Sequence, residues 1–209
     1  MQHVNIIPSV LERTVSAARR RIDELKQLDV PLHLDLMDGR FVTTRSFGPK
    51  SIMQLDVPPH TTAHLMVDEP IPWINACWRI GIRQFVLHVE SRGVSPHAVR
   101  NVHKLFDITM AIDPGTPISL LRPYVPHISG FHVMTVKPGR QGNLFIPSQL
   151  TVVKRLRRQH NGMPIAVDGG MNETTIPLAV AAGVERIIVG SALTHVHDLR
   201  KKYRQLSSL

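Results

Sequence analysis

His33 and Asp35 lie two residues apart in the otherwise apolar stretch His33-Leu34-Asp35-Leu36-Met37. In a β-strand the side chains at positions i and i+2 share one face, so this imidazole and this carboxylate project together. Such a pair can bind a metal ion or transfer a proton, and core packing alone does not require it. The elements that carry the pair therefore decide which chemistry the chain can perform.

The composition is typical of one folded domain. Of the 209 residues, 43% are hydrophobic and 20% are charged, which suits a single domain over residues 1–209. No apolar run approaches the roughly 18 residues that a membrane span requires, and the first residues do not resemble a signal peptide. We therefore expect a cytoplasmic protein with no membrane partner.

The net charge of +9 raises the question of nucleic acid as a partner. The densest basic clusters, at residues 19–21, 155–158 and 200–202, fall on segments of helical period whose other faces are apolar. Solvated helix faces explain these clusters better than nucleic acid does, and a basic field also concentrates a small anionic substrate. The single cysteine, Cys77, excludes an intrachain disulfide and is expected in the core.

Aliphatic and β-branched runs alternate along the whole chain with segments of helical period. We predict eight strands, at residues 4–7, 32–37, 62–66, 85–89, 108–112, 130–134, 165–167 and 187–189. Eight helical segments lie between them, most clearly at residues 147–159 and 172–182, each with a glycine just past its end. This alternation predicts an α/β fold, a single-domain (β/α)8 barrel; no Gly-x-Gly-x-x-Gly follows the first strand, which argues against an open dinucleotide-binding sheet.

Polar residues gather at the carboxyl ends of these strands, where such barrels carry their active sites. They are Ser9, His33, Asp35, His64, His88, Glu90 and Asp168. Imidazole and carboxylate groups from several strands would meet at the mouth of the barrel. That set suits Zn²⁺, Fe²⁺, Mn²⁺ or Co²⁺ and contains no thiolate.

Glycines follow the last two predicted strands, as Asp168-Gly169-Gly170 and as Val189-Gly190-Ser191. Backbone N–H groups at such positions can approach an anion closely, most often a phosphate. The sequence therefore predicts a phosphate site between the ends of strands seven and eight.

These residues belong to an ordered series of motifs that resembles the ribulose-phosphate 3-epimerase family nearly end to end. The motifs are Pro8-Ser9-Val10-Leu11, the stretch from His33 to Val42, Phe47-Gly48-Pro49, His64-Leu65-Met66-Val67, His88-Val89-Glu90, Pro114-Gly115-Thr116-Pro117, Val133 to Gly139, Asp168-Gly169-Gly170 and Gly190-Ser191. The resemblance implies a barrel of the ribulose-phosphate-binding type and an isomerase of carbohydrate metabolism, in the pentose phosphate pathway. It also implies a homo-oligomer.

The resemblance also implies a role for each matching residue. His33, Asp35, His64 and Asp168 would hold one divalent metal ion (Zn, Fe, Mn or Co), and no organic cofactor would be needed. Asp35 and Asp168 would be the catalytic acid and base, inverting C3 of D-ribulose 5-phosphate through a metal-stabilised enediolate to give D-xylulose 5-phosphate. The substrate-binding residues would be Ser9, His64, Met37, Met66, Met134, Gly139, Arg140, Gln141, Gly142, Gly169, Gly170, Gly190 and Ser191.

Three segments depart from the family pattern. The loop after the sixth strand reads Lys137-Pro138-Gly139-Arg140-Gln141-Gly142-Asn143 where Pro-Gly-Phe-Gly-Gly-Gln is usual, Thr43-Thr44-Arg45 replaces a Pro-Asn segment, and Asp113 replaces an asparagine. These changes leave open another ketose phosphate, such as D-allulose 6-phosphate. A non-catalytic phosphate-binding or RNA-binding barrel is a second alternative. A decarboxylase of the hexulose-phosphate synthase group is disfavoured, because Met37 stands where that group has lysine.

The remaining histidines, His132 among them, are expected to be surface or packing residues.

Overall fold

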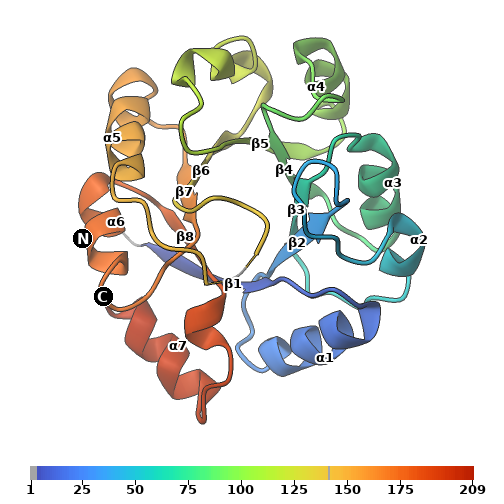
Figure 1. The fold of residues 1–209 in the computed structure, drawn as a ribbon, viewed down its shortest axis with the longest axis vertical. Coiled ribbons are helices and arrows are strands. Elements are labelled where there is room, and N and C mark those ends of the chain that lie inside the picture. The colour runs from blue at the N-terminus through green and yellow to red at the C-terminus, as the bar shows by residue number, and fades with distance from the viewer. Residues whose placement is uncertain (1–3, 141) are drawn as a thin grey trace.

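Eight parallel strands close into a barrel in chain order in the computed structural model, which describes residues 4–140 and 142–209 (Figure 1). The strands are β1 (Asn5–Val10), β2 (His33–Met37), β3 (Thr62–Met66), β4 (Gln84–His88), β5 (Asp107–Ile112), β6 (Gly130–Met134), β7 (Ile165–Asp168) and β8 (Arg186–Val189). Each strand pairs with the next, and β8 pairs with β1. The predicted (β/α)8 barrel is confirmed.

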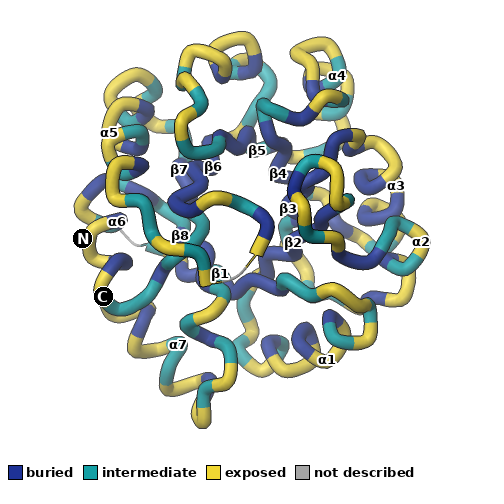
Figure 2. The backbone as a smooth tube through the Cα atoms, in the orientation of Figure 1, coloured by how far each residue is buried: buried dark blue, intermediate teal, exposed yellow. Residues whose placement is uncertain are grey.

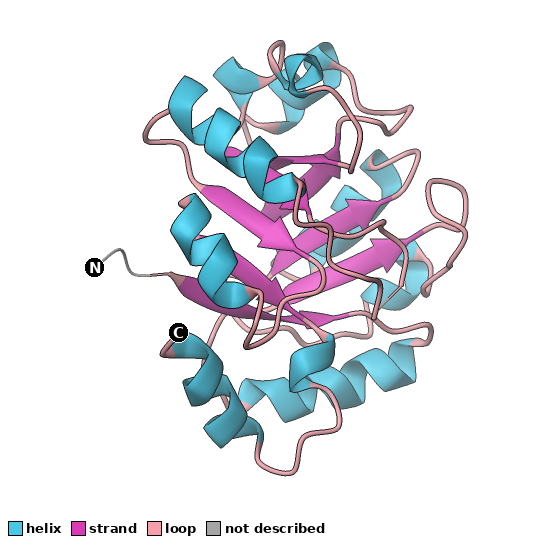
Figure 3. Ribbon diagram, turned by 60° about the vertical axis from the view of Figure 1, so that its left-hand side comes forward, coloured by secondary structure: helices cyan, strands magenta, loops and turns pink. Residues whose placement is uncertain are grey.

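Helices surround the barrel and connect successive strands (Figure 3). They are α1 (Val15–Lys26), α2 (Pro49–Ile52), α3 (Ile71–Arg79), α4 (Pro96–Val102), α5 (Gln149–Gln159), α6 (Ile176–Ala182) and α7 (Leu199–Ser207), with a 3₁₀ helix, η3 (Ser191–Leu193), before α7. The predicted helices over residues 147–159 and 172–182 correspond to α5 and α6. Both begin a few residues later than predicted, and a proline occupies the first turn of α6.

One of the eight predicted helical segments is not an α-helix. The connection from β5 to β6 consists of two 3₁₀ helices, η1 (Ile118–Leu121) and η2 (Val125–His127). Prolines at positions 117, 123 and 126 interrupt this connection. Because proline lacks a backbone N–H and clashes with the preceding turn, this spacing prevents a continuous α-helix.

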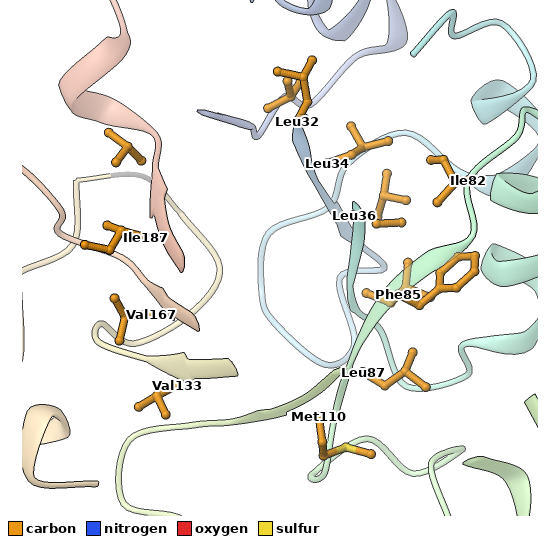
Figure 4. Packing of buried hydrophobic residues seen from close by; sticks show 14 of the residues in the cluster. Leu32, Leu34, Leu36, Ile82, Phe85, Leu87, Met110, Val133, Val167 and Ile187 are labelled. Atoms are coloured by element: carbon orange, nitrogen blue, oxygen red, sulfur yellow. The ribbon is translucent and has the colours of Figure 1, made fainter. Parts of the chain in front are cut away.

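The two faces of each strand carry different kinds of residue. Leu34 and Leu36 of β2 join a large cluster of buried hydrophobic side chains between the strands and the surrounding helices, part of which Figure 4 shows. The strands are buried along most of their length, whereas the exposed residues lie mainly on the outer helices and loops (Figure 2). Burying one leucine side chain fully contributes about 1.5–3 kcal/mol to stability. Because this outer layer stabilises the barrel, the inward faces of the strands can carry polar residues.

The polar residues lie on the inward face, at the carboxyl ends of the strands. The arrowheads that mark these ends lie on one side of the barrel in Figure 3. On that side, the loop after β6 (gold in Figure 1) crosses the opening of the barrel. Residue 141 of this loop lies outside the described residues. Within residues 4–140 and 142–209, no helix is both long and apolar enough to span a bilayer.

Candidate active site

Strand register brings the predicted residues to one level of the barrel. Asp35 of β2 is the partner of His64 of β3 in the pairing, and Ser9 of β1 is the partner of His33. On the other side, Met134 of β6 pairs with Asp168 of β7. Neighbouring parallel strands therefore point these side chains into the barrel at similar depths.

The four residues predicted to bind a metal ion meet at this level. The Nδ1 atom of His64 lies 2.8 Å from Oδ1 of Asp35 and 3.4 Å from Oδ2 of Asp168. The Nε2 atom of His33 lies 3.5 Å from the same Asp35 oxygen and 3.7 Å from the same Asp168 oxygen. Two imidazole nitrogens thus lie between two carboxylate oxygens contributed by different parts of the barrel.

A fifth residue, His132 of β6, completes this cluster, although we expected it to be a packing residue. Its Nε2 atom lies 3.3 Å from Oδ2 of Asp168, and the residue is only 1% exposed. His132 shares the inward face of β6 with Met134, which the sequence predicted at the site. The same alternation along the strand could have identified His132.

This cluster can hold a metal ion. Potential ligand atoms of His33, His64, His132 and Asp168 all lie within 4.8 Å of one another. In addition, Nε2 of His33 is buried and has no hydrogen-bond partner among the described residues. A buried, unpaired imidazole nitrogen costs free energy unless an additional group binds it, so the donor set fits a divalent cation that accepts nitrogen and oxygen ligands.

Burial and hydrogen bonding shift the pKa values of the two carboxyl groups in opposite directions. Burial raises the pKa of Asp35 to about 6, against the opposing effect of its hydrogen bond with His64. Burial acts in the same direction on Asp168, but His132 and His64 outweigh it and hold the pKa of Asp168 well below its usual range. One carboxylate is therefore near its protonation midpoint close to neutral pH while the other is ionised, a pattern found in acid–base pairs.

The histidines respond to the same surroundings in opposite ways. Burial disfavours the charged form of His64, but hydrogen bonds with Asp168 and Asp35 outweigh burial and raise the pKa of His64 to about 9. Burial lowers the pKa of His132 to about 4 and lowers the pKa of His33 well below its usual value. At neutral pH in the metal-free protein, His64 is therefore charged, whereas His33 and His132 are neutral.

A cavity above this cluster contains most of the predicted substrate-binding residues. Its lining includes Ser9, Met66, Met134, Gly139, Arg140, Gly142, Gly169, Gly170, Gly190 and Ser191, together with Asp35 and Asp168. His64 lies fully buried beneath it, and Met37 packs in a small buried cluster with Val42 and Met66. Gln141 lies outside the described residues.

Glycine is required at two of the lining positions. Gly169 has a φ of +107°, and a Cβ atom there would lie 2.3 Å from a methyl group of Val136. Gly170 has a φ of +68°, and its Cβ atom would lie 2.9 Å from Cβ of Phe145. These contacts leave no room for a side chain, so the backbone itself forms this wall of the cavity, as expected of a loop that surrounds an anion.

A second cavity of about 700 Å³ adjoins the first and is basic. Four cationic residues, Arg13, Arg45, Lys137 and Arg140, contribute to its lining, which contains no carboxylate. Within the described part of the chain, none of the four forms an ion pair with an acidic residue. Both cavities share Pro138, Gly139, Arg140 and Asn143 of the loop after β6. Two of the segments that depart from the family pattern therefore border this basic cavity, through residues 43–45 and through residues 137–140 and 143.

The fold and the site define a (β/α)8-barrel enzyme with paired carboxylates and clustered imidazoles at the carboxyl ends of its strands. Two solved structures share the fold: a 3-hexulose-6-phosphate synthase (TM-score 0.72, 12% identity, covering 98% of this chain and 99% of that one) and a KGPDC from Streptococcus mutans (TM-score 0.69, 13% identity, covering 99% and 97%). At these identities the likeness concerns the fold alone.

Sequence comparison defines the family. Residues 5–194 match the model of the ribulose-phosphate 3 epimerase family. The ribulose-phosphate 3-epimerase of Schizosaccharomyces pombe is 31% identical over 95% of this chain and 90% of its own length, and that of Bacillus subtilis is 28% identical over 97% and 98%. A protein of Oryza sativa subsp. japonica named as the cytoplasmic isoform is 32% identical over 90% and 86%. The chain belongs to the ribulose-phosphate 3-epimerase family and is an isomerase.

Proposed function

We propose that this enzyme inverts C3 of D-ribulose 5-phosphate to give D-xylulose 5-phosphate, with Asp35 and Asp168 as its two acid–base groups. The observation that carries the proposal is their placement around His64 Nδ1, at 2.8 and 3.4 Å. Inversion requires one group to remove the C3 proton and another to return a proton to the opposite face. Carboxylates from β2 and β7 are suited to face a substrate from two sides.

The different pKa values of the two carboxyl groups support a division of labour. Asp168 stays ionised and acts as the base in one direction, while Asp35, whose burial raises its pKa to about 6, donates the proton to the other face. The roles exchange in the reverse reaction, because each step leaves a proton on the group that acted as base. Ser9 contacts the sugar, and Met66 and Met134 provide apolar walls that exclude water from the reacting carbon.

His33, Asp35, His64 and Asp168 would hold one divalent metal ion, and the choice among Zn²⁺, Fe²⁺, Mn²⁺ and Co²⁺ is left to experiment. When bound, such an ion supplies Lewis-acid stabilisation of the negative charge that develops on the ketose oxygen. The chain itself orients the ligands, since His33, Asp35 and His64 are buried in the barrel and Asp168 contacts two of them. The phosphate would be bound by the backbone at Gly169, Gly170 and Gly190 and by Ser191.

The basic cavity favours a second candidate substrate, a longer ketose phosphate such as D-allulose 6-phosphate. The four cations around this cavity lie beside the proposed substrate pocket and can bind an anionic group that extends further from the reacting carbon. Transfer of the proton at C3 would use the same two carboxylates. The cytoplasmic location and the homo-oligomer remain predictions of this proposal.

Deuterium exchange tests the proposed function. The protein loaded in turn with Zn²⁺, Fe²⁺, Mn²⁺ and Co²⁺ should introduce deuterium from D₂O at C3 of D-ribulose 5-phosphate while D-xylulose 5-phosphate forms. Exchange with D-allulose 6-phosphate alone would select the second candidate. Failure with both sugars and all four metals would overturn the epimerase proposal, and salt-sensitive RNA binding by the same inactive protein would favour a non-catalytic role.

A further inference from the structure

A second polar cluster lies next to the proposed metal site and takes no part in the proposed proton transfer. It consists of His88 at the end of β4, Glu90 two residues later, and Asp113 just after β5. The Nδ1 atom of His88 lies 3.0 Å from Oδ1 of Asp113 and 3.6 Å from Oε2 of Glu90. These three atoms are buried, and none has a hydrogen-bond partner of good geometry within residues 4–140 and 142–209.

The opposite edge of the His88 ring contacts His64. The two Nε2 atoms are 2.8 Å apart, and the rings lie end to end and nearly coplanar, with centroids 5.0 Å apart and planes inclined by 12°. Both residues are fully buried, and the ring of Phe41 covers His88 at a centroid distance of 4.7 Å. A hydrogen bond at this distance requires one of the two Nε2 atoms to carry a proton and the other to accept it.

Metal binding by His64 decides which nitrogen carries the proton. Nδ1 of His64 faces Asp35 and Asp168, so a ligand role requires Nδ1 to be unprotonated and leaves the proton on Nε2. That N–H then donates to Nε2 of His88, and the proton of His88 must lie on Nδ1. The His88 Nδ1–H in turn faces the Asp113 carboxylate.

We propose that His88 and Asp113 are positioning residues that hold His64 in the tautomer whose Nδ1 lone pair faces the metal. This inference rests on the proposed metal site. Asp113 is better suited than Glu90, because Oδ1 of Asp113 lies 3.0 Å from Nδ1 of His88 whereas Oε2 of Glu90 lies 3.6 Å away. The other oxygen of Glu90, Oε1, accepts a hydrogen bond of 2.9 Å from the Asp113 backbone N–H. The negative charge of a carboxylate at position 113 favours a proton on the facing Nδ1 of His88, whereas the asparagine usual at this position in the family would offer only a neutral acceptor.

The same three residues could instead be considered as a second metal site, since their ligand atoms lie within 4.8 Å of one another. A cation on Nδ1 of His88 would force the His88 proton onto Nε2. With a cation also on Nδ1 of His64, two N–H groups would then point at each other across 2.8 Å. Two neutral imidazoles cannot satisfy this arrangement, so the positioning role is favoured over a second metal.

The test measures tautomers and metal affinity as well as turnover. In Zn²⁺-loaded protein with ¹⁵N-labelled histidine, NMR should find His64 protonated at Nε2 and His88 protonated at Nδ1. Asp113→Leu should shift the His88 proton away from Nδ1 and lower Co²⁺ affinity by about 10- to 100-fold. Asp113→Asn, which keeps a neutral acceptor, should retain the tautomers and lose only a few-fold in affinity. Asp107→Asn, at the far end of β5, is the matched control and should behave as the wild type.

Each result has a definite meaning. If Asp113→Leu is misfolded by circular dichroism, the wild-type tautomers and the graded affinity of Asp113→Asn still decide the question. Unchanged tautomers and affinity in a folded Asp113→Leu variant, or two Zn²⁺ ions per chain, would overturn the positioning role. If the wild type neither binds metal nor exchanges C3 hydrogen, the proposed function itself fails. If it does both while Asp113 has no effect, only the positioning role fails.

Discussion

The imidazole ring of His132 stacks on that of His33, with centroids 5.3 Å apart and planes inclined by only 6°. The two residues come from β6 and β2, which are not neighbours in the barrel, so this contact spans the barrel interior. His132 thereby supports the ring of a proposed metal ligand while its Nε2 atom faces Asp168. A single residue thus restrains two members of the site.

Replacing His132 with leucine should weaken the site without unfolding the barrel, because leucine fills a similar volume at this buried position. The substitution removes the group that holds the pKa of Asp168 low most strongly and leaves His33 without its stacking partner. We expect Co²⁺ affinity and kcat/KM each to fall by about 10- to 100-fold. Competition with a chromophoric chelator measures the affinity.

His97→Leu is the matched control for this substitution, since His97 is exposed on α4, outside the barrel interior. It should leave metal affinity and turnover at wild-type values. A His132→Leu variant with the same affinity and turnover as His97→Leu would show that His132 only fills space.

The barrel was predictable from the sequence because each strand carries its signal locally. Apolar runs bounded by glycine, proline or polar residues mark all eight strands, and the structure moves their bounds by only a few residues. The largest shift is at β1, which continues through Pro8 to Val10, where the prediction ended at residue 7. Its pairing with β2 at Ser9 extends the strand, and such pairing between segments distant in sequence leaves no local pattern.

The site was predictable in part for the same reason. His33 and Asp35 share a strand face by local geometry alone, whereas the contact between His88 and Asp113 depends on how β4 pairs with β5. A one-residue change of register would turn these side chains away from each other, so this contact follows from tertiary structure. His132 could have been found by alternation along β6 but offered no motif of its own.

Removal of either proposed acid–base group should abolish inversion. Asp35→Asn and Asp168→Asn preserve volume but cannot accept and release the C3 proton, so kcat should fall at least about 100-fold in each. Nuclear magnetic resonance of C3 deuterium in D₂O measures exchange separately from net turnover. Both variants should retain the circular dichroism spectrum of the wild type. A fully active Asp168→Asn variant would contradict the two-base assignment.

Metal affinity should rise with pH up to about 9. Because hydrogen bonds raise the pKa of His64 to about 9, this imidazole carries a proton at neutral pH that a metal ion must displace. For each proton that the metal ion displaces, the metal affinity increases by up to about tenfold when the pH increases by one unit. Below about pH 6 Asp35 is also protonated, and the dependence should steepen. Calorimetry in buffers of different ionisation enthalpy counts the released protons, and an affinity independent of pH would refute this expectation.

The basic cavity should act on substrate binding more than on chemistry. Arg45→Gln and Arg140→Gln each remove one cation beside the proposed substrate pocket, so KM should rise several-fold with little change in kcat. The effect should diminish at high salt, which screens exposed charges. Arg158→Gln, on the exposed face of α5, removes the same charge elsewhere and should leave KM unchanged. Equal KM values for all three variants would exclude a role for the cavity in binding.

Gly169→Ala should destabilise the protein and disrupt the proposed phosphate site. Two costs add at this position: a φ of +107°, which alanine rarely adopts, and a Cβ atom placed 2.3 Å from a methyl group of Val136. Gly162→Ala separates them, because Gly162 has a φ of +96° but no atom within 4 Å of the added Cβ. We expect Gly162→Ala to lose about 1–2 kcal/mol and Gly169→Ala to lose clearly more, since overpacking adds roughly 1–3 kcal/mol. Urea unfolding measures both, and equal losses would mean that Val136 moves aside freely and that backbone conformation alone requires glycine at this position.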